Sequence, residues 1–418
     1  MTAWPLFFGI SMIMVGNGLQ NTLLGVRGAL EGFPTYSIGI IMSMYYVGFM
    51  LGSHLMPKLI CGVGHIRVFA AMASAASATA LFHGLFPNEE VWSIIRAVTG
   101  FSYAGLYIVI ESWLNQAADN KTRGRMMAAY LVVLYASMAV GQYLLNLYDP
   151  GGMELFVLTS ILVTMAVLPI SLSSRPAPKF EAPEKVSPRQ LFKTSPLGIY
   201  GVFASGTASA CLFSIGPVYA AKAGLSLSEI ASFMAAAIAG GVLLQFPIGR
   251  CSDIFDRRRV LIAMAAATAF LCALAIFVAP MSVYALYLAM FLIGGTALPI
   301  YGLAAAHTND HLASPQIVAA SASMLMVNGV GSVIGPLLSS GLMTATGRPW
   351  MLFATMGAVY GSIAVFGLYR TLRAAPVPMG LQEKFVAQPS ASSAMIMQQV
   401  AVQAGEPLKS MNKKEDLS

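Results

Sequence analysis

The chain has 418 residues, of which 57% are hydrophobic and only 10% are charged, and its mean hydropathy is +0.72. A soluble domain carries about 25% charged residues, so this composition leaves too few charges to cover a water-exposed surface. The sequence therefore predicts a polytopic membrane protein. A soluble enzyme, a nucleic-acid-binding protein and a secreted disulfide scaffold are excluded, despite the net charge of +7.

Apolar runs between polar breaks predict twelve membrane spans, so the expected fold class is an all-α integral membrane protein. Each run is close to the length of about 20 residues that a membrane helix needs. In chain order the expected spans are 4–26, 36–57, 66–86, 92–115, 126–147, 154–173, 197–220, 228–248, 259–279, 282–306, 315–343 and 349–370.

Two stretches lack the pattern of a span and divide the chain. Residues 174–196 are rich in proline and basic residues, which predicts a cytoplasmic linker. Residues 372–418 are rich in Ser, Gln, Ala and Pro, which predicts a disordered cytoplasmic tail. The expected domains are a six-helix bundle over residues 1–173 and a second one over residues 197–371.

The basic residues predict the orientation in the membrane. With the N-terminus inside, twenty of the 24 Lys and Arg residues face the cytoplasm, and only Arg27, Lys222 and Arg348 face outside. By the positive-inside rule, both termini are expected in the cytoplasm. The first apolar run has no basic segment before it, so we expect an uncleaved first span rather than a signal peptide.

Motifs for metal, redox or nucleotide chemistry are missing from the sequence. The four cysteines form no CxxC pair and have no histidine at metal-ligand spacing, so no metal or other cofactor is expected. The chain contains no Gly-Lys pair and therefore no phosphate-binding loop. Energy is thus expected from an ion gradient, or from the solute's own gradient.

Two predicted loops repeat one another. The loop after span 8 reads Gly249-Arg-Cys-Ser-Asp253-Ile-Phe-Asp256-Arg257-Arg258-Arg259, and it aligns without gaps with residues 57–67 after span 2 at an offset of 192. A second similarity between the halves has an offset of 194. It relates Gly141-Gln142 in span 5 to Gly335-Pro336 in span 11. Two six-span halves related in this way are typical of secondary transporters.

The repeated loop resembles the signature of the major facilitator superfamily, Gly-x-x-x-Asp-x-x-Gly-(Arg/Lys)-(Arg/Lys), with Asp256 at the second glycine. The segment Arg96-Ala-Val-Thr-Gly100 is similar to the superfamily's Arg-x-x-x-Gly pattern in span 4. The resemblance covers about residues 4–371 and implies twelve helices in two pseudo-symmetric six-helix bundles. It also implies alternating access between the halves and a gating role for Asp253, Arg257 and Arg258.

Three segments resemble the YcaD-like branch of bacterial transporters within that superfamily. They are Val109–Ser112, Arg123–Tyr130 and Gln245–Arg250. This narrower resemblance implies a multi-pass protein of the bacterial inner membrane and identifies no substrate.

Away from the ends of the spans, Lys, Arg, Asp and Glu occur only in span 4, where Arg96 and Glu111 lie. Charges inside a membrane are costly, so each is a functional hypothesis. At 100° per residue, Arg96, Tyr103, Tyr107 and Glu111 fall within an arc of about 80°. We expect this stripe to line a water-accessible cavity; the alternative is a structural ion pair or a helix-packing seam.

Glu111 lies 15 residues beyond Arg96, or about 22 Å along a helix, which puts it near the cytoplasmic end. Two roles are open for it. It is either a proton-binding carboxyl group or a gate latch that pairs with Arg123, Arg125 or Lys58, and we favour the latch. A test separates them, because a latch variant would change turnover and leave proton coupling intact.

Neutral polar residues in other spans complete the expected site. Aromatic rings and amides suit a flat or polyhydroxylated solute, although many such residues serve helix packing instead. Span 2 offers Tyr45, Tyr46 and His54. The residues expected to line the substrate cavity with Arg96, Tyr103 and Tyr107 are Asn17, Gln20, Asn21, Tyr130, Tyr135, Gln245, Tyr301 and Asn328.

The function expected is secondary active, proton-coupled transport of a small neutral or anionic organic solute, such as an aromatic or polar nutrient or vitamin. A drug or metabolite efflux antiporter is one alternative, and a transporter-like sensor or assembly factor is another. An enzyme is not expected, because Glu111 has no companion carboxylate, nucleophile or metal ligand in its span. The expected partners are the solute, protons and the lipid bilayer, with no nucleic acid, and the protein is expected to be a monomer.

Overall fold

The computed structural model describes residues 4–117, 123–171, 187–312 and 314–373. These residues form helices and connecting turns, and none of them lies in a strand. The α-helices, a 3₁₀ turn η1 and a π-helical segment η2 are α1 (Trp4–Leu30), α2 (Thr35–Val63), α3 (His65–Leu85), α4 (Glu89–Ala117), α5 (Arg123–Tyr143), η1 (Leu144–Asn146), α6 (Glu154–Met165), α7 (Val167–Ser171), α8 (Pro188–Thr194), α9 (Pro196–Ala210), η2 (Cys211–Ile215), α10 (Gly216–Lys222), α11 (Leu227–Ile254), α12 (Arg257–Val278), α13 (Val283–Ala297), α14 (Pro299–Asn309), α15 (Ser314–Thr346) and α16 (Met351–Arg373).

The expected all-α membrane protein is confirmed. Among the described residues, ten helical segments are long and apolar enough to cross a membrane. The 27-residue α1 and the shorter pair α6 and α7 lie outside that set. The exact number of twelve spans therefore stays a prediction. Three expected spans are each built from consecutive helices, namely α6 with α7, α9 with η2 and α10, and α13 with α14.

Proline explains two of these interruptions. Pro217 stands at the start of α10 and Pro299 at the start of α14. Because proline has no backbone N–H and clashes with the preceding turn, it interrupts the helical hydrogen-bond ladder. In α9–α10 the break takes the form of the π-helical segment η2, a feature often found at functional sites.

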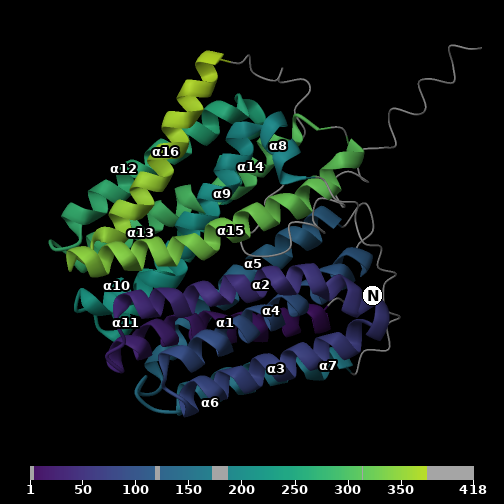
Figure 1. Ribbon diagram of the computed structural model, residues 1–418, viewed down its shortest axis with the longest axis vertical. Coiled ribbons are helices and arrows are strands. Elements are labelled where there is room, and N and C mark those ends of the chain that lie inside the picture. The colour runs from purple at the N-terminus through teal and green to yellow at the C-terminus, as the bar shows by residue number, and fades with distance from the viewer. Residues whose placement is uncertain (1–3, 118–122, 172–186, 313, 374–418) are drawn as a thin grey trace, which may run out of the picture.

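The helices pack in two groups that follow the sequence halves (Figure 1). In the first half α1 packs on α5, and α2 packs on α4, while α3 packs on both α4 and α6. In the second half α9 packs on α15, α11 on α13 and α12 on α16. The halves meet where α2 lies along α15 and where α5 lies along α11.

Glycines allow α2 and α4 to cross backbone to backbone. A Cβ atom on Gly48 would lie 2.6 Å from the carbonyl carbon of Ala97, and one on Gly100 would lie 2.8 Å from that of Tyr45. Real Cβ contacts are longer than this, so a larger residue cannot fit at either position without moving a helix. The crossing fixes the position of Tyr45 relative to the first turns of α4.

The same crossing recurs in the second half at the offset found in the sequence. Gly240 follows Gly48 by 192 residues and faces Phe291 of α13, while Gly294 follows Gly100 by 194 residues and faces Ala237 of α11. A Cβ atom on Gly240 or Gly294 would lie 2.7 or 2.6 Å from the facing carbonyl carbon. The internal repeat is therefore a repeat of helix crossings.

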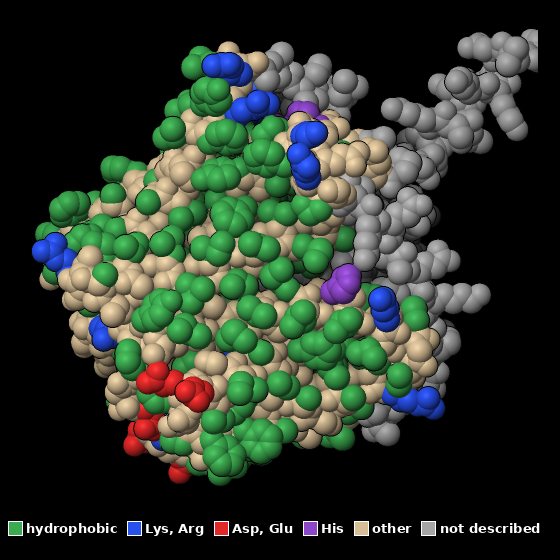
Figure 2. Space-filling view, in the orientation of Figure 1, with side chains coloured by type: hydrophobic (Ala, Val, Ile, Leu, Met, Phe, Trp, Pro, Cys, Tyr) green, Lys and Arg blue, Asp and Glu red, His purple; other side chains and the backbone are tan. Residues whose placement is uncertain are grey.

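Charged residues gather at the two ends of the helices, with a largely hydrophobic surface between them (Figure 2). The acidic end, as we name it, carries Glu31, Glu89, Glu90, Asp149, Glu154 and Glu229 together with Arg27, Lys222 and Arg348. The basic end carries both ends of the described chain and Lys58, Arg67, Arg250, Arg257, Arg258, Arg259, Arg370 and Arg373.

Contacts between the halves lie along the part of α2 that begins at the acidic end. Gly39 packs against Ser340 of α15, and the Ser43 hydroxyl donates to the carbonyl oxygen of Val333 at 2.8 Å. Toward the basic end, the ribbon of α15 diverges from that of α2 (Figure 1). The two halves thus approach most closely at the acidic end.

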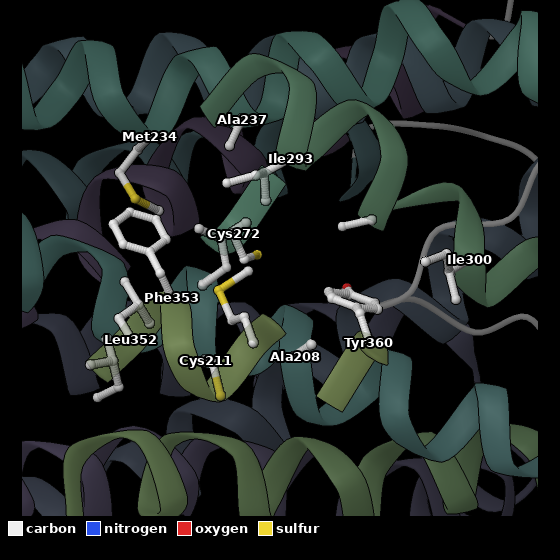
Figure 3. Packing of buried hydrophobic residues seen from close by; sticks show 14 of the residues in the cluster. Ala208, Cys211, Met234, Ala237, Cys272, Ile293, Ile300, Leu352, Phe353 and Tyr360 are labelled. Carbon is white, nitrogen blue, oxygen red and sulfur yellow. The ribbon is translucent and has the colours of Figure 1, made fainter. Parts of the chain in front are cut away.

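The interior of the second half is apolar. Figure 3 shows its core, in which Met234, Cys272, Ile293 and Phe353 are at most 1% exposed. Cys211 of η2 belongs to the same core and donates its thiol to the carbonyl oxygen of Gly335 at 3.1 Å. The two ionisable residues predicted inside the membrane, Arg96 and Glu111, both lie in the first half.

Candidate solute-recognition site

Arg96 is held at a fixed depth in the first half by the start of α4. The Asn88 side-chain oxygen accepts the backbone N–H groups of Glu90 and Val91 at 3.0 and 3.1 Å, which caps the helix at the acidic end. Arg96 follows Glu89 by seven residues, or about 10 Å. Its side chain is 1% exposed.

The Arg96 guanidinium is only partly satisfied by the protein. Nη2 donates to Asn21 Oδ1 at 2.8 Å and lies 3.8 Å from the Met42 sulfur. The guanidinium carbon lies 4.6 Å from the centre of the Tyr45 ring, a cation–π contact. Nε and Nη1 are buried and have no hydrogen-bond partner. No carboxylate among the described residues forms an ion pair with Arg96.

A line of polar groups continues from Arg96 along α1. The Asn21 amide donates to Asn17 Oδ1 at 3.3 Å, and the Asn17 amide donates to the Tyr107 hydroxyl at 3.4 Å. The Tyr107 hydroxyl in turn donates to the Met14 sulfur at 3.2 Å. The structure therefore brings Asn17 and Asn21 of α1 together with Arg96 and Tyr107 of α4.

Aromatic rings from α2 and α4 surround this line. The Tyr45 ring lies 6.2 Å from those of Phe49 and Tyr103, and the Tyr107 ring lies 6.0 Å from Phe49 and 6.3 Å from Tyr103. Tyr103 is fully buried, and its hydroxyl has no hydrogen-bond partner. On the same helix, Tyr46 is half-buried and reaches Ser214 of η2 in the second half.

Gln20 is a further buried group without a partner. Its side chain is 0% exposed, and neither its amide nitrogen nor its carbonyl oxygen makes a hydrogen bond. A buried polar group left in this state costs about 1–3 kcal/mol, so Gln20 remains a candidate for contact with a ligand.

Glu111 and Tyr130 form a separate contact nearer the basic end. The Tyr130 hydroxyl donates to Glu111 Oε1 at 2.9 Å, and the two side chains are 0% and 1% exposed respectively. Tyr135 is also buried, one helix turn further along α5. The side chains of Arg123 and Arg125, two of the three expected latch partners beside Lys58, lie outside the described residues, so the latch stays a prediction.

The second-half candidates do not join the Arg96 site. The Asn328 amide donates to the carbonyl oxygen of Val202 at 3.0 Å, so this side chain fastens α15 to α9. Gln245 and Tyr301 are buried at 5% and 0% exposure, and the Tyr301 hydroxyl has no partner.

The signature residues at the basic end form a charge cluster. The sequence predicted Asp253, Arg257 and Arg258 as members of it, but not Asp310. Arg257 Nη1 lies 2.7 Å from Asp310 Oδ1, and Arg257 Nη2 lies 3.4 Å from Asp253 Oδ1. Arg258 is also buried, at 7% exposure. Asp310 was missed because it follows span 10 and belongs to no motif. Its one signal was an acidic residue in a short loop at the end where basic residues predominate.

These features define a class of protein, a helical membrane protein with a buried and only partly hydrogen-bonded arginine inside one of two repeated halves. The chain belongs to the Major Facilitator Superfamily, whose family profile matches residues 6–244 and 198–404. It is thus a member of a family of membrane transporters.

Named relatives and solved structures agree with this assignment. YcaD of Escherichia fergusonii, described as an uncharacterized MFS-type transporter, is 28% identical over 340 residues, which cover 81% of this chain and 88% of YcaD. Ent638_1421 of Enterobacter sp. (strain 638) carries the same description and is 28% identical over 343 residues, with the same coverage.

Two crystal structures share the fold. A mutant of the nucleoside transporter NupG superposes with a TM-score of 0.73 at 15% identity, covering 87% of this chain and 98% of NupG. The fucose:proton symporter FucP of E. coli, also as a mutant, superposes with a TM-score of 0.55 at 14% identity, covering 88% of this chain and 97% of FucP. At these identities the likeness shows the fold alone.

Proposed function

We propose that the protein is a secondary active, proton-coupled transporter that moves a small neutral or anionic organic solute across the bacterial inner membrane by alternating access. Its basic end, with both termini, faces the cytoplasm. The observation that carries the proposal is Arg96, a cation that is 1% exposed, has no carboxylate partner among the described residues and keeps two nitrogen donors unpaired.

The energetic cost of this arrangement supports a binding role. Removing one charge from water costs several kcal/mol, and that cost is offset only when a good partner is present. Asn21 and Tyr45 supply one neutral hydrogen bond and one cation–π contact. Charged residues inside a membrane usually mark solute or ion pathways, and a solute that supplies the remaining hydrogen bonds would account for Arg96.

The placement of the polar groups supports an asymmetric transporter. The line from Arg96 to Met14 runs through α1 and α4, and Tyr45 adds α2, so all three helices belong to the first half. In the second half the equivalent of Arg96 is near Leu288, by the repeat offset. The first half then recognises the solute, while the second half closes over it.

Transport by the purified full chain in proteoliposomes tests the proposal. A thermal-shift screen of vitamins, sugars, organic acids and drugs identifies a solute, because a ligand that binds the folded state raises the melting temperature. Uptake of that solute with and without an imposed pH gradient then tests coupling. We expect Arg96→Gln to abolish uptake and Arg67→Gln, at an exposed position of the basic end, to preserve it. Equal uptake by both variants would contradict the recognition role of Arg96, and failure of the parent chain to accumulate any solute that it binds would contradict transport.

A further inference from the structure

The charge around Arg96 specifies the charge of its ligand. Three side chains contact the guanidinium: the amide of Asn21, the thioether of Met42 and the phenol ring of Tyr45. All three groups are neutral. The recognition site, taken as these residues with Arg96, therefore carries one uncompensated positive charge. One negative charge on the ligand balances it. A dianion would leave a buried charge in excess, and a cation would add a second one, and both are costly in a low-dielectric interior.

The unpaired hydrogen-bonding atoms specify the chemical group. Arg96 Nε and Nη1 can only donate hydrogen bonds, and the Tyr103 hydroxyl can donate as well. A carboxylate accepts several hydrogen bonds at once and is the common partner of a guanidinium.

The rings around the guanidinium specify the shape of the remaining part of the ligand. Tyr45, Phe49, Tyr103 and Tyr107 have neighbouring centroids 6.0–6.3 Å apart. Aromatic rings of this kind pair with flat apolar groups in offset or edge-to-face arrangements. Phe49, together with Asn21 and Tyr46, is half-buried rather than fully buried, so the ring cluster reaches accessible surface.

We propose that the transported solute is a planar aromatic monocarboxylate, with its carboxylate on Arg96 and the Tyr103 hydroxyl and its ring among the four aromatic side chains. This inference rests on the proposed function and narrows its substrate class from neutral or anionic solutes to one kind of anion. Tyr103 acts as a second donor to the carboxylate, while Nε and Nη1 of Arg96, which can only donate, separate a carboxylate from a carboxamide of the same shape.

Matched acid and amide pairs test the charge. The full-length protein in detergent is titrated by calorimetry with benzoate, nicotinate and indoleacetate, each beside its amide, and with acetate and phthalate. We expect at least one aromatic monocarboxylate to bind about 10-fold or more tightly than its own amide, since a hydrogen bond to a charged group is worth about 1.5–3 kcal/mol. We expect acetate, which lacks the ring, and the dianion phthalate to bind more weakly than that acid.

Variants assign the binding to the residues named. Arg96→Gln should weaken binding of the acid about 10-fold or more and remove its preference over the amide, while Tyr103→Phe should weaken it about 5-fold. Arg67→Gln is the matched control and should leave binding unchanged. Without ligand, Arg96→Gln should melt at a higher temperature than the parent chain, because it removes a buried charge that lacks a partner.

The outcomes distinguish this inference from the proposed function. If an amide or another neutral solute binds and is transported in an Arg96-dependent manner while none of the acids is preferred, the transporter stands and the monocarboxylate inference is overturned. If Arg96→Gln lowers the melting temperature of the ligand-free protein and leaves both binding and uptake unchanged, Arg96 is a structural residue, and the monocarboxylate inference is overturned while transport stands. If the parent chain accumulates none of the solutes that it binds, the proposed function fails.

Discussion

The Arg257 guanidinium and the Asp310 carboxylate lie 2.7 Å apart, and each side chain is only 1% exposed. The pair joins the first residue of α12 to the residue that follows α14. Arg257 Nη1 also lies 3.4 Å from the carbonyl oxygen of Ala306 in α14, and Nη2 lies 3.4 Å from Asp253 in α11. One guanidinium thus links three helices at the basic end.

Removing the acid of this pair is expected to destabilise the second half. Asp310→Asn leaves the buried Arg257 charge with the more distant and half-exposed Asp253 as its carboxylate partner. Breaking a buried ion pair from one side costs about 3–5 kcal/mol. We expect a loss near the lower value, about 3 kcal/mol, in the free energy of unfolding, measured by denaturant titration in mixed micelles.

Arg259 provides the control within the same motif. Its side chain is 79% exposed and lies 3.7 Å from Asp256. Exposed ion pairs contribute only about 0–1 kcal/mol, so Arg259→Gln should change the free energy of unfolding by less than about 1 kcal/mol. Equal losses for Asp310→Asn and Arg259→Gln would show that burial of the Arg257 pair contributes nothing.

The crossing of α2 and α4 gives a second prediction. Gly48→Ala inserts a methyl group against the Ala97 backbone, which cannot rotate away, so the helices must separate. Overpacking of this kind typically costs about 1–3 kcal/mol. Because the separation also moves Tyr45 away from Arg96, solute binding should weaken together with stability.

Gly62→Ala is the matched control on the same helix. Nothing lies within 4 Å of a Cβ atom at Gly62. Alanine is favoured over glycine in a helix by up to about 1 kcal/mol, so this variant should be neutral or slightly stabilising in the same melting and binding measurements. Similar behaviour of Gly48→Ala would argue against a tight crossing.

Glu111→Gln tests the latch against the proton site. Under the latch interpretation, the variant removes a charge used when the basic end is closed. We therefore expect a changed turnover number with pH-driven accumulation intact in proteoliposomes. Tyr130→Phe keeps the carboxylate and removes only the hydroxyl 2.9 Å from it, so its effect should be smaller. Loss of pH-driven accumulation in Glu111→Gln, with solute exchange retained, would favour the proton site instead.

Native cysteines report the orientation. Cys61 and Cys251 are exposed near the basic end, whereas Cys211 and Cys272 are buried. With the basic end in the cytoplasm, a membrane-impermeant maleimide should label the protein in inside-out vesicles and leave it unlabelled in intact cells. Glu90→Cys, at an exposed position of the acidic end, should be labelled in intact cells when Cys61 and Cys251 are replaced by serine. The reverse pattern would invert the topology.

Helix periodicity was enough to predict which candidate residues share a helix face. The arc that holds Arg96, Tyr103 and Tyr107 depends only on 100° per residue. Asn17 and Asn21 are four residues apart and lie on one face, where the structure shows a hydrogen bond between them. The repeat offset could also be obtained from the sequence, because the glycine crossings require residues at fixed intervals in both halves.

Contacts between distant helices were not predictable. Polarity identifies Asn328 as a residue that needs a partner, but the partner is a backbone carbonyl of α9, at Val202, which has no sequence signal. The Arg257–Asp310 pair depends on how α12 meets the end of α14. Pro217 marks a break between α9 and α10, but the sequence does not show that this break takes the form of the π-helical segment η2, since a hydrophobic pattern does not record one extra residue in a turn.

The glycine crossings also have a mechanical consequence. Two helices whose backbones touch at Gly48 and Gly100 cannot slide past each other, so α2 and α4 move as one rigid unit. Arg96 and Tyr45 lie on one side of the crossing, and Lys58 and Glu111 lie on the other side, toward the basic end. A tilt of this unit moves the guanidinium and the Tyr45 ring together, relative to Asn21 of α1. Distance changes measured between spin labels on α2 and α4 should therefore stay near zero through the cycle, while those between α2 and α15 should vary.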